Sequence, residues 1–540
     1  MRRIFRFLCS VKKRYIIIPL ILVYLLLVCV PYVFQGGVSA ATKSAFSLSD
    51  YYSNSEGTDR AEVLFTNEEA LTERLRLIEH AEDRIILSTF EFRADNSGKK
   101  MLAALYEAAG RGVEVQLVID GFSYFKNASS RAYFRALGAL DNVTIKIYNP
   151  VNVLKPYRLM ARLHDKYMIV DDEAYILGGR NTYDFFLGTE TTYVNYDWDV
   201  LVWNSAAGDD AATLTEADST DNADDNTDGL TGDSSDAAAS SSLYQVEEYF
   251  NSIWELSVCK VKLDSVNFLN EKKTAEAAAE LEELYAEMKT ENPDWFAETD
   301  YAASTVSTNS IQLLSNPIEA SVKEPTLFYN MTELMALSAA GGEDVIFHTP
   351  YIMCNSYMME RLEYICSAAA GADADTDTDA GANPDSGSTD LNEDTAADTA
   401  SVTMMTNSVA NNGNPFGASD YQAHRDAILA TGLSVLEYDS GVSYHGKCFT
   451  IGERLTAIGS FNWDMRSAYL DTELMLVIDS EELNAQMRAC MEEYESQALT
   501  VNADGSFDLQ DGQEASVLTD KKKRRNAFVR PLTLFFRFLL

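Results

Sequence analysis

The chain contains two blocks in which short apolar runs alternate with longer amphipathic ones. In the first block, the predicted strands are "RIILSTFEF" (84–92), "VEVQLVID" (113–120), "VTIKIYN" (143–149) and "YDWDVLVWN" (196–204). Helices are expected over 97–112, which Gly112 closes, and over 129–140. Strands that alternate with helices predict an α/β fold with a mostly parallel sheet and helices on both faces.

The second block repeats the first in outline. The run "EDVIFHTPYIM" (343–353) echoes "EDRIILSTFEF" (82–92), and the helix expected over 356–370 echoes the one over 97–112. The strand "VTMMTNSVA" (402–410) then matches "VEVQLVID". A repeat of about 200 residues is too long for a solenoid. It indicates an internal duplication into two α/β domains.

Two tracts interrupt these blocks. Residues 205–242 and 371–400 consist largely of Ala, Asp, Ser and Thr and contain no Lys or Arg. Such a composition offers little to bury, so we expect both tracts to be disordered inserts. They hold much of the formal net charge of −40. An acidic exterior argues against a nucleic acid as the main partner, although the acid could simply keep the chain solvated.

The first residues have the pattern of a membrane-targeting segment. A basic flank (1–14) precedes "YIIIPLILVYLLLVCVPYVF" (15–34), which carries no charge and approaches the ~20 residues that span a bilayer. We expect a transmembrane anchor with the flank in the cytoplasm and the rest of the chain outside. The alternative is a signal peptide cleaved near "VSAA", which begins at Val38.

The remaining boundaries follow from changes in composition. A polar linker (35–60) leads into the first α/β domain (61–258), and a helix-rich connector (259–316) joins it to the second (317–500). The last segment (501–540) is an acidic linker followed by a basic tail, "KKKRRNAFVRPLTLFFRFLL". This tail is too short and too charged to span a bilayer, but it fits an amphipathic segment on an anionic membrane surface. A disordered basic tail is the alternative.

The clearest chemical signal is a pair of matching hairpin sequences, "HDKYMIVDDEAYILGGRN" and "HGKCFTIGERLTAIGSFN". The shared residues are His164, Lys166 and Asn181 in the first copy, and His445, Lys447 and Asn462 in the second. In both copies the asparagine follows the histidine by seventeen residues and lies in a glycine-containing bend. Alternate residues of a strand point to the same side, so each histidine shares a face with its lysine.

These residue types suit the breakage of a phosphodiester without a metal. The reaction needs a nucleophile, an acid for the leaving oxygen, and cations for the phosphate oxygens. Two histidines supply the first two, lysines and asparagines the third, and a carboxylate fixes each histidine tautomer. One motif alone could be a hairpin with a structural histidine, but two copies indicate one shared site. His80, His348 and His424 have no such context, and no cysteine spacing indicates a disulfide framework or a zinc site.

The paired motifs resemble those of the phospholipase D superfamily, H-x-K-x4-D followed by G-[GS]-x-N. Within it, the chain resembles the bacterial cardiolipin synthases, both in the motif regions and in blocks such as "TPYIM" and "AAGRGVEVQLVID". The likeness runs from residue 61 to residue 490 outside the two tracts. It implies two pseudo-twofold-related domains, each a mixed sheet flanked by helices, that share one active site. It also implies a phosphohistidine intermediate, with no metal and no other cofactor.

The resemblance assigns roles to the matched residues. His164 would be the nucleophile and His445 the general acid and then base, or the reverse. The residues that would hold the phosphate are Lys166, Lys447, Asn181 and Asn462. Glu473 matches the acid that orients a motif histidine, and Asp197 is expected to be its counterpart, with Asp199 as the alternative.

The two motifs differ at their last position. Asp171 ends the first, whereas Gly452 stands at this place in the second. The position falls at the turn of the hairpin, so we expect the loss of the carboxylate to affect the rigidity of the hairpin more than the chemistry. The family pattern nevertheless includes Asp171 in the catalytic motif, and the asymmetry favours His164 as the nucleophile.

The sequence therefore predicts a membrane-bound phosphatidyltransferase of a bacterial cell membrane, with its catalytic region outside the cytoplasm. It would make cardiolipin from phosphatidylglycerol and a second phospholipid, so its partners would be phospholipids and the membrane. A phospholipase D-type hydrolase would use the same residues and is the main alternative. A nuclease and a non-enzymatic lipid-binding scaffold are further ones.

Overall fold

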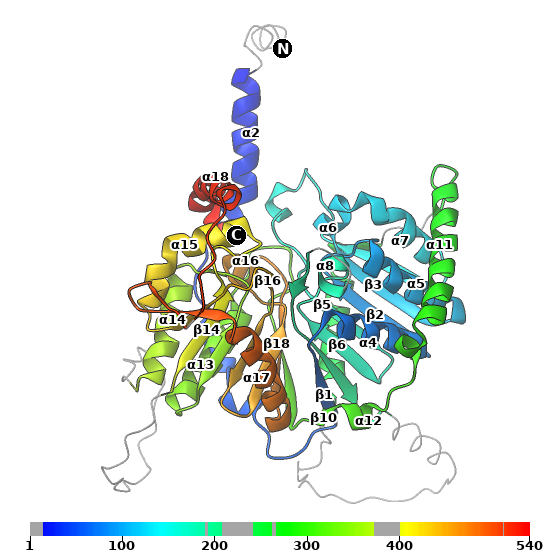
Figure 1. Cartoon of the computed structure of the whole chain (residues 1–540). Helices are drawn as coiled ribbons and strands as arrows, with labels where there is room; N and C mark the ends of the chain where they lie inside the picture. Colours follow the sequence, from blue (N-terminus) through cyan, green and yellow to red (C-terminus); the bar gives the residue numbers. More distant parts are fainter. Residues whose placement is uncertain (1–13, 189–192, 208–240, 262–265, 372–399, 511) are drawn as a thin grey trace, which may run out of the picture.

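Two similar halves lie side by side in the computed structural model of the chain (Figure 1). The structure describes residues 14–188, 193–207, 241–261, 266–371, 400–510 and 512–540. Nearly all of the predicted basic flank (1–14) and most of the two predicted inserts (205–242 and 371–400) therefore lie outside the described residues.

The first half is built on a nine-stranded sheet. In spatial order its strands are β10 (Val306–Ser307), β1 (Asp59–Leu64), β8 (Asp199–Asn204), β6 (Ala174–Gly178), β5 (Lys166–Val170), β2 (Arg84–Thr89), β3 (Glu114–Asp120), β4 (Val143–Tyr148) and β9 (Cys259–Val261). Only β2, β3 and β4 pair in parallel. The other pairings are antiparallel.

The second half repeats the order of eight of these strands, from β1 to β9, and adds β22 at one edge where the first half has β10 at the other. Its sheet runs β11 (Ser310–Ser315), β20 (Leu474–Asp479), β18 (Leu455–Gly459), β17 (Cys448–Ile451), β12 (Val345–His348), β14 (Val402–Asn407), β15 (Ser434–Tyr438), β21 (Ala498–Val501) and β22 (Phe507–Asp508). Only β12, β14 and β15 pair in parallel. The duplication predicted from the sequence is confirmed, because each motif hairpin, β5–β6 or β17–β18, occupies the same place in the shared order of eight strands.

The prediction of a mostly parallel sheet was wrong. Each motif folds as a tight hairpin, and a short turn between neighbouring strands can join them only in antiparallel fashion. The hairpin therefore sits beside a parallel core of three strands and reverses the direction of the sheet there. The result is the mixed sheet that the family resemblance implies.

Helices cover the outer face of each sheet and also enter the space between the halves. On the first half the outer helices are α4 (Asn67–His80), α5 (Asn96–Arg111), α7 (Arg131–Leu137) and α11 (Glu271–Glu291), and on the second they are α13 (Thr326–Ala340), α14 (Ser356–Ala369) and α15 (Pro415–Leu429). A third core, shared by the two sheets, buries the apolar faces of α10 (Leu243–Glu255) and α17 (Glu481–Glu495). The halves are therefore fused through apolar side chains.

Shorter elements complete the fold. The remaining α-helices of the body are α3 (Ala40–Ala45), α6 (Gly121–Lys126), α8 (Asp184–Leu187), α12 (Tyr301–Ser304) and α16 (Met465–Tyr469). Two small parallel pairs join β13 (Ile352–Met353) to β19 (Trp463–Asp464), and β7 (Asn195–Tyr196) to β16 (Ser443–Tyr444). The second pair links the two halves directly beside the second motif.

Local sequence signals account for the helix ends. The side chain of Asp95 accepts a hydrogen bond from the amide of Gly98 and caps the start of α5. Gly112 closes the same helix in the left-handed region, at a φ of 109°, where a side chain would be strained. The predicted helix over 97–112 is confirmed within one residue at each end.

The N-terminal helix differs from the predicted anchor. Helix α2 (Arg14–Cys29) has 16 residues, or ~24 Å at 1.5 Å per residue, whereas a bilayer core is about 30 Å thick. It ends before Pro31, which lacks the N–H that a continuing α-helix needs. Among the residues that the structure describes, no helix is both long and apolar enough to cross a membrane. The predicted transmembrane span over 15–34 is therefore not found.

The basic tail forms a helix against the second half. Helix α18 (Asp520–Phe536) is capped by Thr519, whose hydroxyl accepts a hydrogen bond from the Lys522 amide. It packs on α15 and buries Asn526, Val529 and Thr533. In Figure 1 it lies at the foot of α2, which projects from the body.

Candidate active site

The two motif histidines lie where the halves meet. The amide of His164 donates to the Thr472 hydroxyl of the second half at 3.1 Å. The amide of His445 donates to the Tyr196 carbonyl of the first half at 2.6 Å. Each motif strand is therefore fixed at its start by a residue from the opposite half.

His164 is oriented by a carboxylate of the second half. Its Nδ1 lies 2.8 Å from Glu473 Oε1. The hydroxyl of Ser467 donates to the same carboxylate oxygen at 2.6 Å, and that of Ser460 donates to the other. Glu473 is fully buried, so these three partners satisfy a carboxyl group that water does not reach.

His445 is oriented by a carboxylate of the first half. Its Nδ1 lies 2.6 Å from Asp197 Oδ2, which also receives Lys447 Nζ at 3.1 Å. The amide of Trp198 donates to the other oxygen of Asp197 at 2.9 Å. A Cβ at Gly179 would collide with this carboxylate, so the glycine leaves the room in which Asp197 lies. The acids thus cross over between the halves.

The alternative carboxylate, Asp199, has a different role. It forms buried ion pairs with Arg74 at 2.9 Å and with Arg180 at 3.4 Å. Of the two aspartates that the sequence offered, the structure brings Asp197 to a histidine.

Both motif lysines are buried beside the histidines. Lys166 and Lys447 are only 2% and 1% exposed, and each donates from Nζ to the carbonyl of its own motif histidine. Lys447 also pairs with Asp197, whereas no described carboxylate lies within ion-pair distance of Lys166. Burial lowers the pKa of Lys166 to about 8, which leaves it mostly charged at neutral pH.

The two asparagines lie in the bends that follow the second strand of each hairpin, three residues after its end, and are buried. Asn181 Oδ1 accepts a hydrogen bond from the Glu91 amide at 3.3 Å. Asn462 Oδ1 has no hydrogen-bond partner among the described residues. A buried amide with unused capacity is a polar group that a ligand could satisfy.

The site holds both imidazoles neutral at pH 7. Burial, followed by Lys166 and Lys447, lowers the pKa of His164 well below its usual value. Burial and Lys447 also lower the pKa of His445, to about 4, although the charge of Asp197 opposes them. An anion placed between the cations would raise both values.

The two orienting acids differ in their ionisation. Burial raises the pKa of Glu473 to about 7, against the opposing charge of Lys166. Burial would also raise that of Asp197, but Lys447 and His445 outweigh it and hold the pKa at about 2. Asp197 is therefore a carboxylate throughout the neutral range, whereas Glu473 titrates within it.

Asp171, the last residue of the first motif, is not part of this site. It lies at the turn of the hairpin with a φ of 50°. Its carboxylate accepts hydrogen bonds from the amides of Glu82, Asp83 and Arg84, at 2.7–2.9 Å. Gly452 takes nearly the same conformation in the second half, with a φ of 53°. The difference at this position thus acts on the turn and does not distinguish the histidines.

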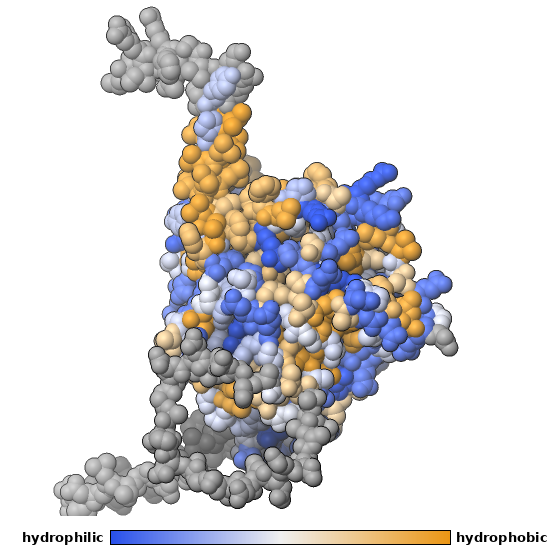
Figure 2. Space-filling view, turned by 90° about the vertical axis from the view of Figure 1, so that its left-hand side faces the viewer, coloured by the Kyte–Doolittle hydropathy of each residue, from blue (hydrophilic) through white to orange (hydrophobic). Residues whose placement is uncertain are grey.

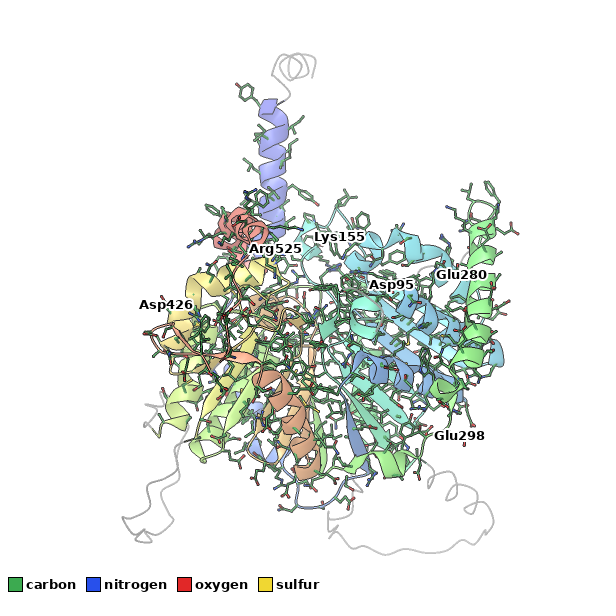
Figure 3. The ribbon with its side chains drawn as sticks, in the orientation of Figure 1. Asp95, Lys155, Glu280, Glu298, Asp426 and Arg525 are labelled. Carbon is green, nitrogen blue, oxygen red and sulfur yellow. The ribbon has the colours of Figure 1, made fainter. Side chains whose placement is uncertain are left out.

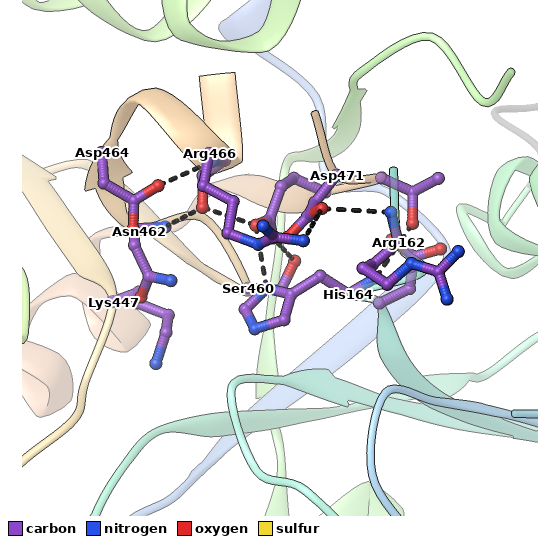
Figure 4. A network of polar contacts seen from close by, with 12 residues as sticks. Arg162, His164, Lys447, Ser460, Asn462, Asp464, Arg466 and Asp471 are labelled. Carbon is purple, nitrogen blue, oxygen red and sulfur yellow. Dashed lines mark hydrogen bonds and ion pairs between the residues drawn. The ribbon is translucent and has the colours of Figure 1, made fainter. Parts of the chain in front are cut away.

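Several neighbours of the histidines were not predicted from the sequence. Phe90 and Phe186 each meet one imidazole edge to face, at centroid distances of 5.1 and 5.0 Å. A polar network beside His164 joins Arg162, Arg466 and Asp471 (Figure 4). A serine in the second motif's bend was the one visible signal, since Ser460 stands where the first motif has a glycine.

Comparisons with known proteins show what this chain is similar to. A family model described as cardiolipin synthase, PLD-like domain, matches residues 75–211 and 384–494, one segment in each half. The solved structure of a phosphatidylserine synthase from Haemophilus influenzae covers 93% of this chain and 99% of its own, with a TM-score of 0.56 and 13% identity. At that identity the likeness shows the fold alone.

Two curated proteins are also similar to this chain in sequence. An uncharacterized protein of Helicobacter pylori is 21% identical over 80% of this chain and 78% of its own length. Cardiolipin synthase C of Escherichia coli is 30% identical, over 25% of this chain and 29% of its own length. The match thus spans less than a third of that synthase. Together with the family model, these similarities show that the chain belongs to the phospholipase D superfamily, near the cardiolipin synthases.

Proposed function

We propose that this chain is a phosphatidyltransferase that makes cardiolipin from phosphatidylglycerol and a second phospholipid. The observation that carries the proposal is the exchange of acids between the halves: Glu473 orients His164 and Asp197 orients His445. Two oriented imidazoles and two buried lysines are what metal-free transfer of a phosphodiester requires. The similarity to cardiolipin synthases supports phospholipids as the substrates.

The first step would form a covalent intermediate. Nε2 of neutral His164 attacks the phosphorus of the donor phospholipid, while Glu473 holds the proton on Nδ1. The bond from phosphorus to the head-group oxygen breaks. His445, whose pKa the bound phosphate anion raises so that it takes up a proton, gives that proton to the departing alkoxide. The products are a phosphatidyl group on His164 and a free head-group alcohol.

The second step would transfer this group to phosphatidylglycerol. His445, now neutral, takes the proton from a glycerol hydroxyl of the acceptor, and the resulting oxygen attacks phosphorus. The bond from phosphorus to His164 breaks, which releases cardiolipin and restores both imidazoles. Water in place of the acceptor would give phosphatidic acid.

The two acids favour this division of roles. A general acid must be protonated, and the constant negative charge of Asp197 favours the imidazolium form of His445. A nucleophile must be neutral, and burial together with Lys166 lowers the pKa of His164 well below its usual value. The substrate phosphate would lie beside Lys166 and Lys447 and accept hydrogen bonds from Asn181 and Asn462.

We also propose that the face that carries α2 and α18 meets a membrane surface. Apolar side chains of α2 are widely exposed along the helix (Figure 2), and on α18 Phe528 and Phe535 are about three-quarters exposed. Five consecutive cations, Lys521 to Arg525, stand beside them, and Arg525 and Lys155 lie on the side of the body from which α2 projects (Figure 3). In a chain of net charge −40, this cluster suits anionic lipid.

Lipid product analysis tests the enzymatic proposal. Purified full chain is incubated with phosphatidylglycerol vesicles, and lipids are separated after the reaction. We expect cardiolipin and free glycerol from the wild type and none from His164→Ala. His80→Ala is the matched control, because His80 bonds only the Phe296 carbonyl away from the site. Phosphatidic acid without cardiolipin would replace transfer by hydrolysis, and no lipid product would remove the proposal altogether.

Vesicle sedimentation tests the membrane proposal. The protein should sediment with vesicles that contain phosphatidylglycerol and far less with phosphatidylcholine alone, and the difference should shrink at high salt. Replacing Lys521 and Lys523 with glutamine should weaken the anionic preference. Equal sedimentation with both vesicle types would contradict a role for the basic cluster.

A further inference from the structure

The residues that follow α18 reach the helix next to the second motif. The amide of Arg466, in α16, donates to the Leu540 carbonyl at 3.0 Å. Its Nη1 donates to the Leu539 carbonyl at 3.2 Å. Leu539 is only 7% exposed and belongs to the core of the second half. These residues are thus built into the body, far along the chain from both motifs.

Arg466 connects this contact to the first half. Its Nη2 donates to the Met160 carbonyl at 2.7 Å, and its Nε pairs with Asp471 at 2.9 Å. Asp471 in turn accepts a hydrogen bond at 3.1 Å from the amide of Arg162, two residues before His164 (Figure 4). A continuous chain of polar contacts therefore runs from Leu540 to the segment that carries His164, just before β5.

The end of the tail has its own anchors. Arg537 forms two bonds with the buried carboxylate of Asp420, in α15, at 2.8 and 2.9 Å. The side chain of Gln35, just beyond α2, donates to the Phe538 carbonyl at 2.7 Å. The tail is thereby fixed to α15 and to the foot of α2 before it meets Arg466.

We propose that residues 537–540 are a positioning clamp for the active site, in which Arg466 transmits the position of the tail to His164. None of residues 537–540 forms a hydrogen bond or an ion pair with His164 or His445, so the clamp would act on the placement of the segment that carries His164. Displacements of about 1 Å at a distance from the chemistry can reduce turnover about a hundredfold. The matches to the family model end at residue 494, so the clamp lies outside the shared segments.

Removal of the Arg537 ion pair is the first test. Its kinetic measurement rests on the proposed function. In Arg537→Gln, kcat for cardiolipin formation should fall about tenfold while KM for phosphatidylglycerol changes less than about twofold. Hydrogen exchange of the α16 amides should become faster in the same variant. Arg425→Gln is the matched control, because Arg425 forms a comparable ion pair with Glu437 from the same helix α15. It should leave kcat and α16 exchange unchanged.

Two further variants separate positioning from folding. Asp420→Arg combined with Arg537→Glu reverses the ion pair and should restore kcat and slow exchange. Arg466→Lys keeps the positive charge near His164 but cannot make all the hydrogen bonds to the carbonyls. If position matters, its kcat should be lower than that of the wild type. A wild-type kcat in Arg466→Lys would show that charge alone is needed and would overturn the clamp.

The exchange measurement keeps the clamp testable on its own. If the wild type makes no lipid product, the proposed function fails, yet faster α16 exchange in Arg537→Gln would still support the clamp. Where Arg537→Gln unfolds, Gln35→Ala removes only the bond to Phe538 and should raise α16 exchange in a folded protein. Unchanged α16 exchange in these variants would overturn the proposal.

Discussion

The crossed acids make a prediction that can tell the two histidines apart. Asp197→Asn keeps the size of the side chain but removes the charge that lies 2.6 Å from His445 Nδ1 and 3.1 Å from Lys447 Nζ. That charge opposes burial in setting the pKa of His445 at about 4. Its loss should lower the pKa further and reduce the population of imidazolium that can protonate a leaving group.

The size of the effect follows from the role of the proton. A positioned general acid contributes about 10²–10⁴ in rate, or about 3–5 kcal/mol at 1.36 kcal/mol per decade. We therefore expect Asp197→Asn to lower kcat about 10³-fold when glycerol leaves from phosphatidylglycerol. A phosphatidyl donor with a p-nitrophenol head group needs no proton for departure, so its first step should slow by less than about tenfold.

Glu473→Gln provides the contrast, because it acts on the other histidine. If His164 is the nucleophile, misorientation of its ring should slow the first step with both donors by a similar factor. The assay is rapid measurement of p-nitrophenol release beside glycerol release. In Asp197→Asn, a burst of one equivalent of p-nitrophenol should precede slow turnover, since the second step still needs His445 as a base.

Folding must be controlled in this experiment. Removal of one partner from a buried ion pair costs about 3–5 kcal/mol, and Asp197 is the one carboxylate that pairs with Lys447 among the described residues. Both variants should therefore be assayed below their measured melting temperatures. Equal losses with both donors in Asp197→Asn would refute the role of His445 as the acid. The opposite pattern between the two variants would exchange the roles of the histidines.

Three further predictions concern the turn, the glycine and pH. Asp171→Gly should lower the free energy of unfolding in urea by about 1–3 kcal/mol, because three amides lose their acceptor, and should leave kcat unchanged; a large loss of kcat would put Asp171 back into the chemistry. Gly179→Ala should reduce kcat as Asp197→Asn does, because the new methyl group displaces the carboxylate, and a wild-type rate would contradict the close packing. The pKa of His445 is lowered to about 4 in the folded chain, whereas it is about 6.5 in the unfolded chain. Between these two pH values the unfolded chain therefore binds a proton at this residue and the folded chain does not. Stability should therefore be lost as pH falls from about 6.5 to 4, by about 3 kcal/mol from this group, and urea unfolding of His445→Gln should lack that part of the slope.

Most of the fold could be predicted from the sequence where it depends on residues close together in the chain. The spacing of apolar residues gave α5 and its neighbouring strands, and the repetition of that spacing gave the duplication. The direction of strand pairing was not readable in the same way, because a strand has the same period in either direction. The short turn at Asp171 was the feature that indicates antiparallel pairing. The length of α2 was overestimated because hydropathy does not register the break at Pro31.

The sequence predicted the types of residue in the site, but not which acid orients which histidine. The motifs identify His164 and His445, yet 309 residues separate His164 from Glu473, and no local pattern shows that an acid serves the opposite half. Asp197 and Asp199 are two residues apart, so alternation along a strand cannot separate them. Only the packing of Arg74 and Arg180 against Asp199 decides between them.

The orienting acids of the two halves differ in their proton chemistry, and Gly179 and Ser460 stand at matched positions beside them. At this matched position the glycine admits the short side chain of Asp197, and Lys447 keeps that acid ionised with a pKa of about 2. In the other half, burial raises the pKa of Glu473 to about 7, although the hydrogen bond that Ser460 donates to it acts in the opposite direction. The difference therefore arises around the acids and not at the last motif position, where both halves form the same turn. Since each acid serves the histidine of the other half, neither half alone contains a complete site, and the duplication can divide the roles of nucleophile and acid only while the halves remain joined.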